Sequence, residues 1–172
     1  MTTDREPLDP GGGDATDHNC FGCGRLNEHG LQLNLIPDPD GYGVFTAFVP
    51  ASRTEGYTGM VHGGIITTVL DEVMAWSLAR HGIWAVTGQL TTRYRKPVVL
   101  GEATTAIGFL VRDRGRAIEM RGEIRRDADR VLLANATATF IRVPPSKASE
   151  WQSRYGSFGA AEPTEPMEGG DR

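Results

Sequence analysis

A glycine pair and a carboxylate two helical turns further on are the residues of this chain best suited to chemistry. His62-Gly63-Gly64 opens an apolar stretch that contains Asp71. Backbone N–H groups in the first turn of a helix have no intrahelical partner and carry partial positive charge. Glycine lets a ligand oxygen approach these amides, so Gly63 or Gly64 can stabilise the oxyanion of an attacked carbonyl. His62 would then hold the loop or contact the substrate; alternatively, the glycines only allow tight entry into the helix.

Asp71 supplies the second half of such a site. It lies in the middle of the most apolar helical stretch of the chain, and an ionised carboxylate is costly to bury without a partner. We interpret it as a general base or nucleophile that faces a substrate cleft. The alternative is a solvated helix face that Asp71 shares with Thr67, Thr68 and Glu72. Together with the glycine pair, this carboxylate favours acyl transfer or hydrolysis.

The spacing between the two groups carries a prediction about quaternary structure. Gly63 and Asp71 lie roughly 12 Å apart along a helix that rises about 1.5 Å per residue. One carbonyl cannot contact both groups of the same chain. If both act on it, Asp71 must come from a second subunit whose helix runs antiparallel, which predicts a symmetric dimer with two sites across its interface.

The elements that position these groups follow from the apolar periodicity. Period-two patterns alternate with turn residues on both sides of one helical pattern. The predicted order is a strand at Leu31–Ile36, a strand at Tyr42–Val49, a helix over 64–80, and strands at Trp84–Val99, Glu102–Val111, Ala117–Arg125 and Val131–Arg142. Because no second long helix could form crossovers for a parallel sheet, we predict an α+β fold in which a curved antiparallel sheet of about six strands wraps one buried helix.

Composition limits the domain organisation, the partners and the location that we expect for the chain. The chain has 172 residues and a net charge of −4, which suits one soluble domain and argues against nucleic-acid binding. We expect a flexible segment at 1–17, a folded domain at 18–143 and a flexible tail at 144–172, in which Trp151, Tyr155 and Phe158 form at most a short amphipathic turn. The polar, acidic N-terminus is unlike a signal peptide and no apolar run reaches membrane-spanning length, so a cytoplasmic location and no membrane partner are expected.

The two cysteines, Cys20 and Cys23, indicate a reducing compartment. By ligand type they could bind zinc together with His18 and His29. Their spacing is irregular and the second cysteine pair of a strong zinc motif is absent. We therefore predict a packed turn that covers the sheet or the substrate tunnel, and no metal.

Two motifs together resemble those of a known family. His62-Gly63-Gly64 followed by Asp71, and then Leu90-Thr91-Thr92-Arg93-Tyr94-Arg95-Lys96-Pro97, is similar to the PaaI-type hotdog-fold thioesterases. The leader Cys20-Phe21-Gly22-Cys23-Gly24, with Asn27 and Gly30-Leu31, resembles one branch of that family. The resemblance covers roughly residues 19–142. It implies a hotdog fold, dimers that often pair into tetramers, and hydrolysis of acyl-CoA thioesters without any cofactor other than the coenzyme A of the substrate.

The resemblance also implies roles for individual residues. Gly63 or Gly64 corresponds to the oxyanion-hole glycine, Asp71 to the catalytic carboxylate, and Thr87 to the hydroxyl residue that orients the attacking water. Many relatives carry an Asn or Gln upstream of the glycines, which would fall at Gly56 here. Either Glu55 replaces it in substrate binding or the role is absent.

Other residues suggest how a substrate is held. Arg93, Arg95 and Lys96 form a basic patch that suits the phosphates of coenzyme A, or else they are solvated strand ends. Four aromatic residues, Phe45, Phe48, Trp76 and Trp84, either narrow an acyl tunnel or belong to the core. The sequence does not specify the acyl group.

We therefore predict a hotdog-fold acyl-CoA thioesterase that acts as a dimer or a dimer of dimers. Asp71 would activate water, or attack the carbonyl through an anhydride. Two alternatives stay open: a non-catalytic module that binds acyl-CoA, and an enzyme of secondary metabolism that acts on a carrier-protein thioester.

Overall fold

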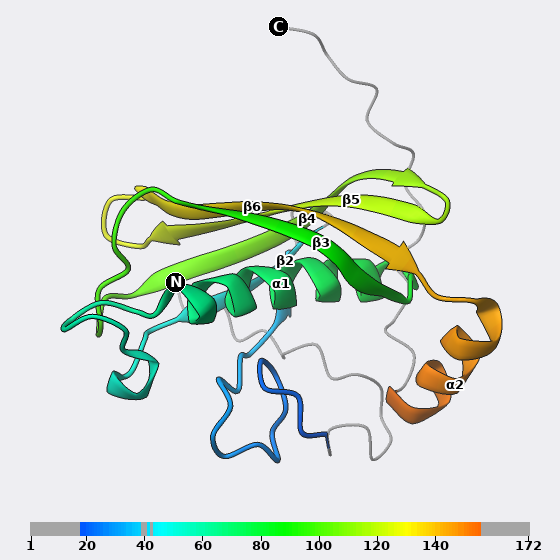
Figure 1. Cartoon of the computed structure of the whole chain (residues 1–172), viewed down its shortest axis with the longest axis horizontal. Coiled ribbons are helices and arrows are strands. Elements are labelled where there is room, and N and C mark those ends of the chain that lie inside the picture. Colours follow the sequence, from blue (N-terminus) through cyan, green and yellow to red (C-terminus); the bar gives the residue numbers. More distant parts are fainter. Residues whose placement is uncertain (1–17, 39–40, 42, 156–172) are drawn as a thin grey trace, which may run out of the picture.

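The computed structural model describes residues 18–38, 41 and 43–155 and shows one long helix lying across one face of an antiparallel sheet (Figure 1). The elements are β1 (Ile36–Pro37), β2 (Val44–Phe48), the short 3-10 helix η2 (Ser52–Thr54), α1 (Gly63–Arg80), β3 (Ala85–Tyr94), β4 (Thr104–Arg114), β5 (Ala117–Arg126), β6 (Leu132–Arg142) and α2 (Pro145–Tyr155). The predicted α+β class, with one buried helix and six antiparallel strands, is confirmed.

The sheet order is β1-β2-β4-β5-β6-β3, so the strand that follows α1 returns to an edge of the sheet. Each neighbouring pair is antiparallel, and among the described strands β3 pairs only with β6. The prediction of a strand at Leu31–Ile36 was wrong over most of its length, because only Ile36 and Pro37 pair with β2. Gln32 has a φ of 50° that interrupts an extended backbone. The alternation in this segment reflects burial of Leu33 and Leu35 in the core instead of strand pairing.

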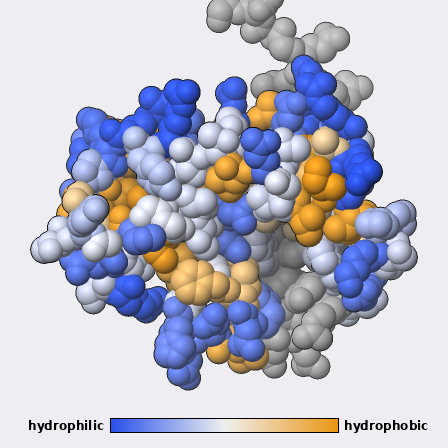
Figure 2. Space-filling model, viewed as in Figure 1, coloured by the Kyte–Doolittle hydropathy of each residue, from blue (hydrophilic) through white to orange (hydrophobic). Residues whose placement is uncertain are grey.

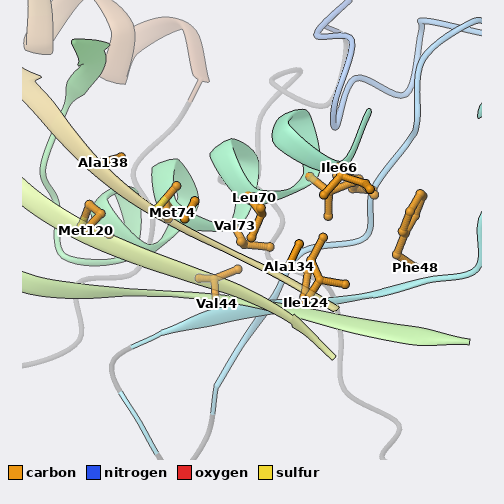
Figure 3. Close-up of a cluster of buried hydrophobic side chains, with 14 of the residues drawn as sticks. Val44, Phe48, Ile66, Leu70, Val73, Met74, Met120, Ile124, Ala134 and Ala138 are labelled. Carbon is orange, nitrogen blue, oxygen red and sulfur yellow. The ribbon is translucent and has the colours of Figure 1, made fainter. Parts of the chain in front are cut away.

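Helix α1 fills the concave side of the sheet because it is apolar around most of its circumference. Leu70, Val73 and Met74 are completely buried between helix and sheet (Figure 3). The helix lies very close to the sheet at Gly108 of β4, where an added Cβ would lie 2.4 Å from the Val73 carbonyl oxygen. A side chain at this position would push α1 away, so this glycine sets the distance between the two layers.

A buried serine fixes the register between α1 and two strands. Ser77 Oγ accepts a hydrogen bond from Val44 N at 3.0 Å. It also lies 2.7 Å from the carbonyl oxygens of Val73 and Gly108, which share its single hydroxyl proton. Because the serine satisfies backbone groups of both layers, it holds the helix at one position along the sheet.

The chain after β6 differs from the sequence-based expectation. Residues 145–155 form helix α2, where we expected no more than a short turn. The ring of Trp151 packs edge-on against Trp84, with centroids 6.2 Å apart. Trp84 precedes β3 in the sequence, so this contact was not visible from local patterns. The predicted flexible segment at 1–17, and Phe158 with the rest of the tail beyond 155, lie outside the described residues.

Candidate active site

Helix α1 begins at the glycine pair, and His62 caps it. The Nδ1 atom of His62 accepts a hydrogen bond from Gly64 N at 3.0 Å. This bond engages the Gly64 amide, whereas the amide of Gly63, at the first helical position, has no intrahelical partner. The two glycines therefore differ. The Gly64 amide is bonded to the cap residue His62, whereas the Gly63 amide is left to donate to a ligand.

A chain of hydroxyl groups ties this helix end to β3. The Tyr94 hydroxyl donates to Gly63 O at 3.0 Å. Thr67 Oγ1 lies 2.8 Å from the Tyr94 hydroxyl and 3.2 Å from Thr92 Oγ1. With one donor per hydroxyl, the direction that satisfies all the bonds runs from Thr92 through Thr67 and Tyr94 to Gly63. Tyr94 and Thr92 were not identified as site residues from sequence, although both lie in the motif after the helix.

A pocket of about 620 Å³ opens in front of the helix N-terminus. It is lined by backbone and side chains of three segments, which are Gly56–Tyr57, Met60–Gly63 with Ile66, and Tyr94–Val98. Arg95 and Lys96 therefore belong to the pocket wall, while Arg93 lies outside it on β3. Arg95 is held by a 2.7 Å hydrogen bond from its Nε to Asn135 Oδ1. Two cations and a helix N-terminus make this pocket suited to an anionic or polarised ligand.

Asp71 and Thr87 form a hydrogen-bonded pair on the helix and the edge strand. Thr87 Oγ1 donates to Asp71 Oδ1 at 2.7 Å. Burial raises the pKa of Asp71, the hydrogen bond from Thr87 opposes that rise, and the charge of Cys20 adds to it. The pairing register of β3 with β6 shifts between Thr87 and Gln89 of β3. Bulges of this kind change the direction of side chains next to functional sites. The pair can hold and activate a water molecule.

The upstream residues Glu55 and Gly56 are engaged in the loop that precedes α1. Glu55 Oε1 accepts a hydrogen bond from Gly59 N at 2.7 Å, so its carboxylate closes the loop, and Glu55 is not among the pocket-lining residues. An added Cβ at Gly56 would lie 2.9 Å from His62 Cα. The backbone at Gly56 therefore leaves no room for an amide side chain.

The four aromatic residues have different surroundings. Phe48 is buried in the core cluster, and Trp84 packs against Trp151 of α2. Trp76 is partly buried against the same core, and Phe45 lies on β2 opposite Ile36 and Ile107. None of the four lines the pocket at the helix N-terminus.

Comparisons with known proteins find related sequences and folds. Residues 58–133 match the model of the thioesterase superfamily. Acyl-coenzyme A thioesterase THEM4 of Mus musculus is 31% identical over 93 residues, which are 54% of this chain and 40% of that protein. An uncharacterised protein of Schizosaccharomyces pombe is 33% identical over 115 residues, which are 64% of this chain and 65% of that protein. The chain thus spans less than two thirds of each relative.

Solved structures show the same fold. A thioesterase superfamily protein with 31% identity superposes with a TM-score of 0.61, over 65% of this chain and 57% of that one. The PaaI protein of E. coli has 18% identity and a TM-score of 0.61, over 66% of this chain and 81% of that one. A Streptococcus mutans protein solved with acetyl CoA has 22% identity and a TM-score of 0.60, over 64% and 88%. Within the described residues, no helix combines the length and apolarity needed to cross a bilayer.

Proposed function

We propose that this chain, whose residues 58–133 match the model of the thioesterase superfamily, hydrolyses acyl-CoA thioesters to a free acid and coenzyme A. The observation that carries the proposal is the 2.7 Å bond from Thr87 to Asp71 on the helix whose N-terminal amide, at Gly63, faces a cationic pocket. The names of the THEM4 relatives support the substrate class.

The N-terminus and the middle of α1 have different parts in the hydrolysis. The thioester carbonyl binds at the helix N-terminus, where the Gly63 amide stabilises the negative charge that develops on its oxygen. Asp71 takes a proton from water held by Thr87, and the water oxygen attacks the carbonyl carbon. The carbon–sulfur bond then breaks, and the CoA thiolate leaves and is protonated. Direct attack by Asp71 through an anhydride is the second route, and no metal or further cofactor is required for either.

We propose that the two halves of each site come from different subunits. β3 is an edge strand of ten residues, and many of its side chains are exposed, including Val86 and Tyr94. Figure 2 shows hydrophobic residues in separate patches among polar ones on the face seen in Figure 1. Unpaired strand edges favour pairing with another strand. Antiparallel pairing of two β3 strands would bring Gly63 of one chain towards Asp71 of the partner subunit, in a dimer or a pair of dimers.

The basic residues around the pocket fit the rest of the substrate. Arg95 and Lys96 lie on the pocket wall, and Arg93 is exposed two residues earlier on β3. Guanidinium and ammonium groups bind phosphate oxygens through charge-assisted hydrogen bonds. We infer that these residues contact the phosphates of coenzyme A.

The test is thiol release from acyl-CoA by Asp71→Asn. We expect the variant to lose most turnover and to keep its fold and its ability to bind CoA. The chain offers a matched control in Asp127, whose Oδ1 accepts a 2.7 Å hydrogen bond from Thr105 Oγ1 at an exposed strand end. Asp127→Asn should hydrolyse at the wild-type rate. Near-normal turnover by Asp71→Asn would remove this carboxylate from the mechanism.

The close packing of Gly56 on His62 favours a second candidate, because the site lacks the upstream amide side chain of many relatives. The chain would then bind acyl-CoA without hydrolysing it. Calorimetric CoA binding without thiol release, in the same preparation, would support this module. Hydrolysis of carrier-protein thioesters in preference to CoA thioesters would instead identify the carrier-bound acyl group as the substrate.

A further inference from the structure

The turn that carries both cysteines lies against a carboxylate of α1 that the proposed hydrolysis does not use. Cys20 Sγ and Glu72 Oε1 are 3.2 Å apart in a hydrogen bond. The ligand atoms of Cys20, Cys23 and Glu72 all lie within 4.8 Å of one another. Cys20 and Glu72 are 52 residues apart in the chain, so the third member of this group could not be found from the local cysteine motif.

The backbone of the turn is shaped around these three groups. A Cβ added at Gly22 would lie 2.3 Å from Glu72 Cγ, so only glycine lets the turn lie this close to the carboxylate. Gly24 N donates to Cys20 O at 2.9 Å and closes the turn. The thiolate is the form of cysteine that binds metal.

The three groups are partly buried beside one another, so their ionised forms would repel one another. Among the described residues, no arginine or lysine forms an ion pair with Glu72. A bound divalent cation would replace the protons and offset this repulsion.

We propose that Cys20, Cys23 and Glu72 bind one divalent metal ion of the zinc type, with water in the fourth position. Ligand atoms about 2.0–2.3 Å from zinc in a tetrahedron lie roughly 3.5–3.8 Å apart, which the observed group reaches with small side-chain rotations. Nδ1 of His18 instead accepts a hydrogen bond from the Cys20 amide at 3.4 Å. The sequence alone favoured a metal-free turn, because the spacing of the cysteines and histidines was irregular and a second cysteine pair was absent; the fold adds Glu72 as a third ligand.

The metal would fasten the segment from Cys20 to Gly24 onto the middle of α1, beside Asp71. It takes no part in the hydrolysis step, so the proposal does not depend on the proposed activity. Its expected effect is ordering of this segment, which hydrogen exchange of its amides reports directly.

The first experiment measures metal in the unaltered, reduced protein. We expect about one zinc per chain after growth in zinc-supplemented medium. Replacement by Co²⁺ should give thiolate-to-cobalt charge-transfer absorption with the intensity of two sulfur ligands, and chelation should speed hydrogen exchange at residues 20–24. Absence of zinc together with failure to take up Co²⁺ would overturn the proposal. An intact mass about 2 Da low in the freshly purified chain would also overturn it, in favour of a Cys20–Cys23 disulfide.

Substitutions then test each ligand. Cys20→Ser, Cys23→Ser and Glu72→Gln should each lower Co²⁺ affinity by more than about tenfold, since even outer-shell partners contribute 10–100-fold. His29→Gln is the matched control, because His29 is exposed and lies outside the group; it should bind metal as the wild type does. Unchanged affinity in Glu72→Gln, or lost affinity in His29→Gln, would contradict the assignment, and circular dichroism verifies that each variant is folded.

Discussion

Replacement of Gly108 by alanine tests whether the distance between α1 and the sheet is set by one residue. The new Cβ would lie 2.4 Å from Val73 C and O and 2.5 Å from Met74 N. Ordinary contacts between such atoms are about 3.5 Å, so the helix must move by roughly 1 Å. The atoms in the way are helix backbone within a densely packed core and cannot rotate aside. We therefore expect a loss of about 3 kcal/mol in the free energy of unfolding, at the upper end of overpacking costs.

The chain provides a control in the same layer. Gly122 lies directly opposite Gly108 on β5, but its added Cβ would meet Leu70 Cδ2 at 3.2 Å and Met74 Cγ at 3.4 Å. These are side-chain atoms that can shift, so Gly122→Ala should cost less than about 1 kcal/mol.

Urea unfolding and calorimetry of the two variants measure the difference. For a chain of this size, about 3 kcal/mol corresponds to a melting temperature roughly 6–12 °C lower. Gly108→Ala should also lose turnover, because a displaced α1 carries Asp71 away from Thr87. Equal stability of the two variants would refute the reasoning that backbone contact at Gly108 fixes the helix.

Three further predictions test the site and its support. Thr87→Val should lower kcat about tenfold, which corresponds to about 1.4 kcal/mol, whereas Thr87→Ser should stay near the wild-type value. Equal kcat for the wild type and both variants in steady-state kinetics would remove Thr87 from the mechanism. Ser77→Ala should lower the free energy of unfolding by about 1–3 kcal/mol, since Val44 N–H loses its acceptor; an unchanged urea midpoint would be inconsistent with this. Lys96→Met should raise KM for acyl-CoA several-fold and leave KM unchanged for a short thioester without phosphates, and an equal effect on both substrates would argue against a phosphate contact.

Local patterns in the sequence were enough to predict the architecture. The helix over 64–80 and four following strands depend on periodicity within one segment, and their existence was confirmed with shifts of a few residues at their ends. The glycine pair marked the start of α1 because a helix start depends on neighbouring residues. Where periodicity had another cause, as at Leu33 and Leu35, the sequence misled: burial alone produces the same alternation as strand pairing.

Contacts between distant segments were decided only by the tertiary structure. His62 Nδ1 accepts a hydrogen bond from the Gly64 amide. This bond distinguishes two glycines that the sequence left equivalent. Position 87 was chosen by resemblance, whereas its hydroxyl bond to Asp71 depends on where β3 returns beside α1. Cys20 meets Glu72 because the N-terminal turn packs against α1. Hydrophobic periodicity is a local property of the chain, but the pairing of polar side chains depends on how the segments pack, and that packing is what brings the chemistry together.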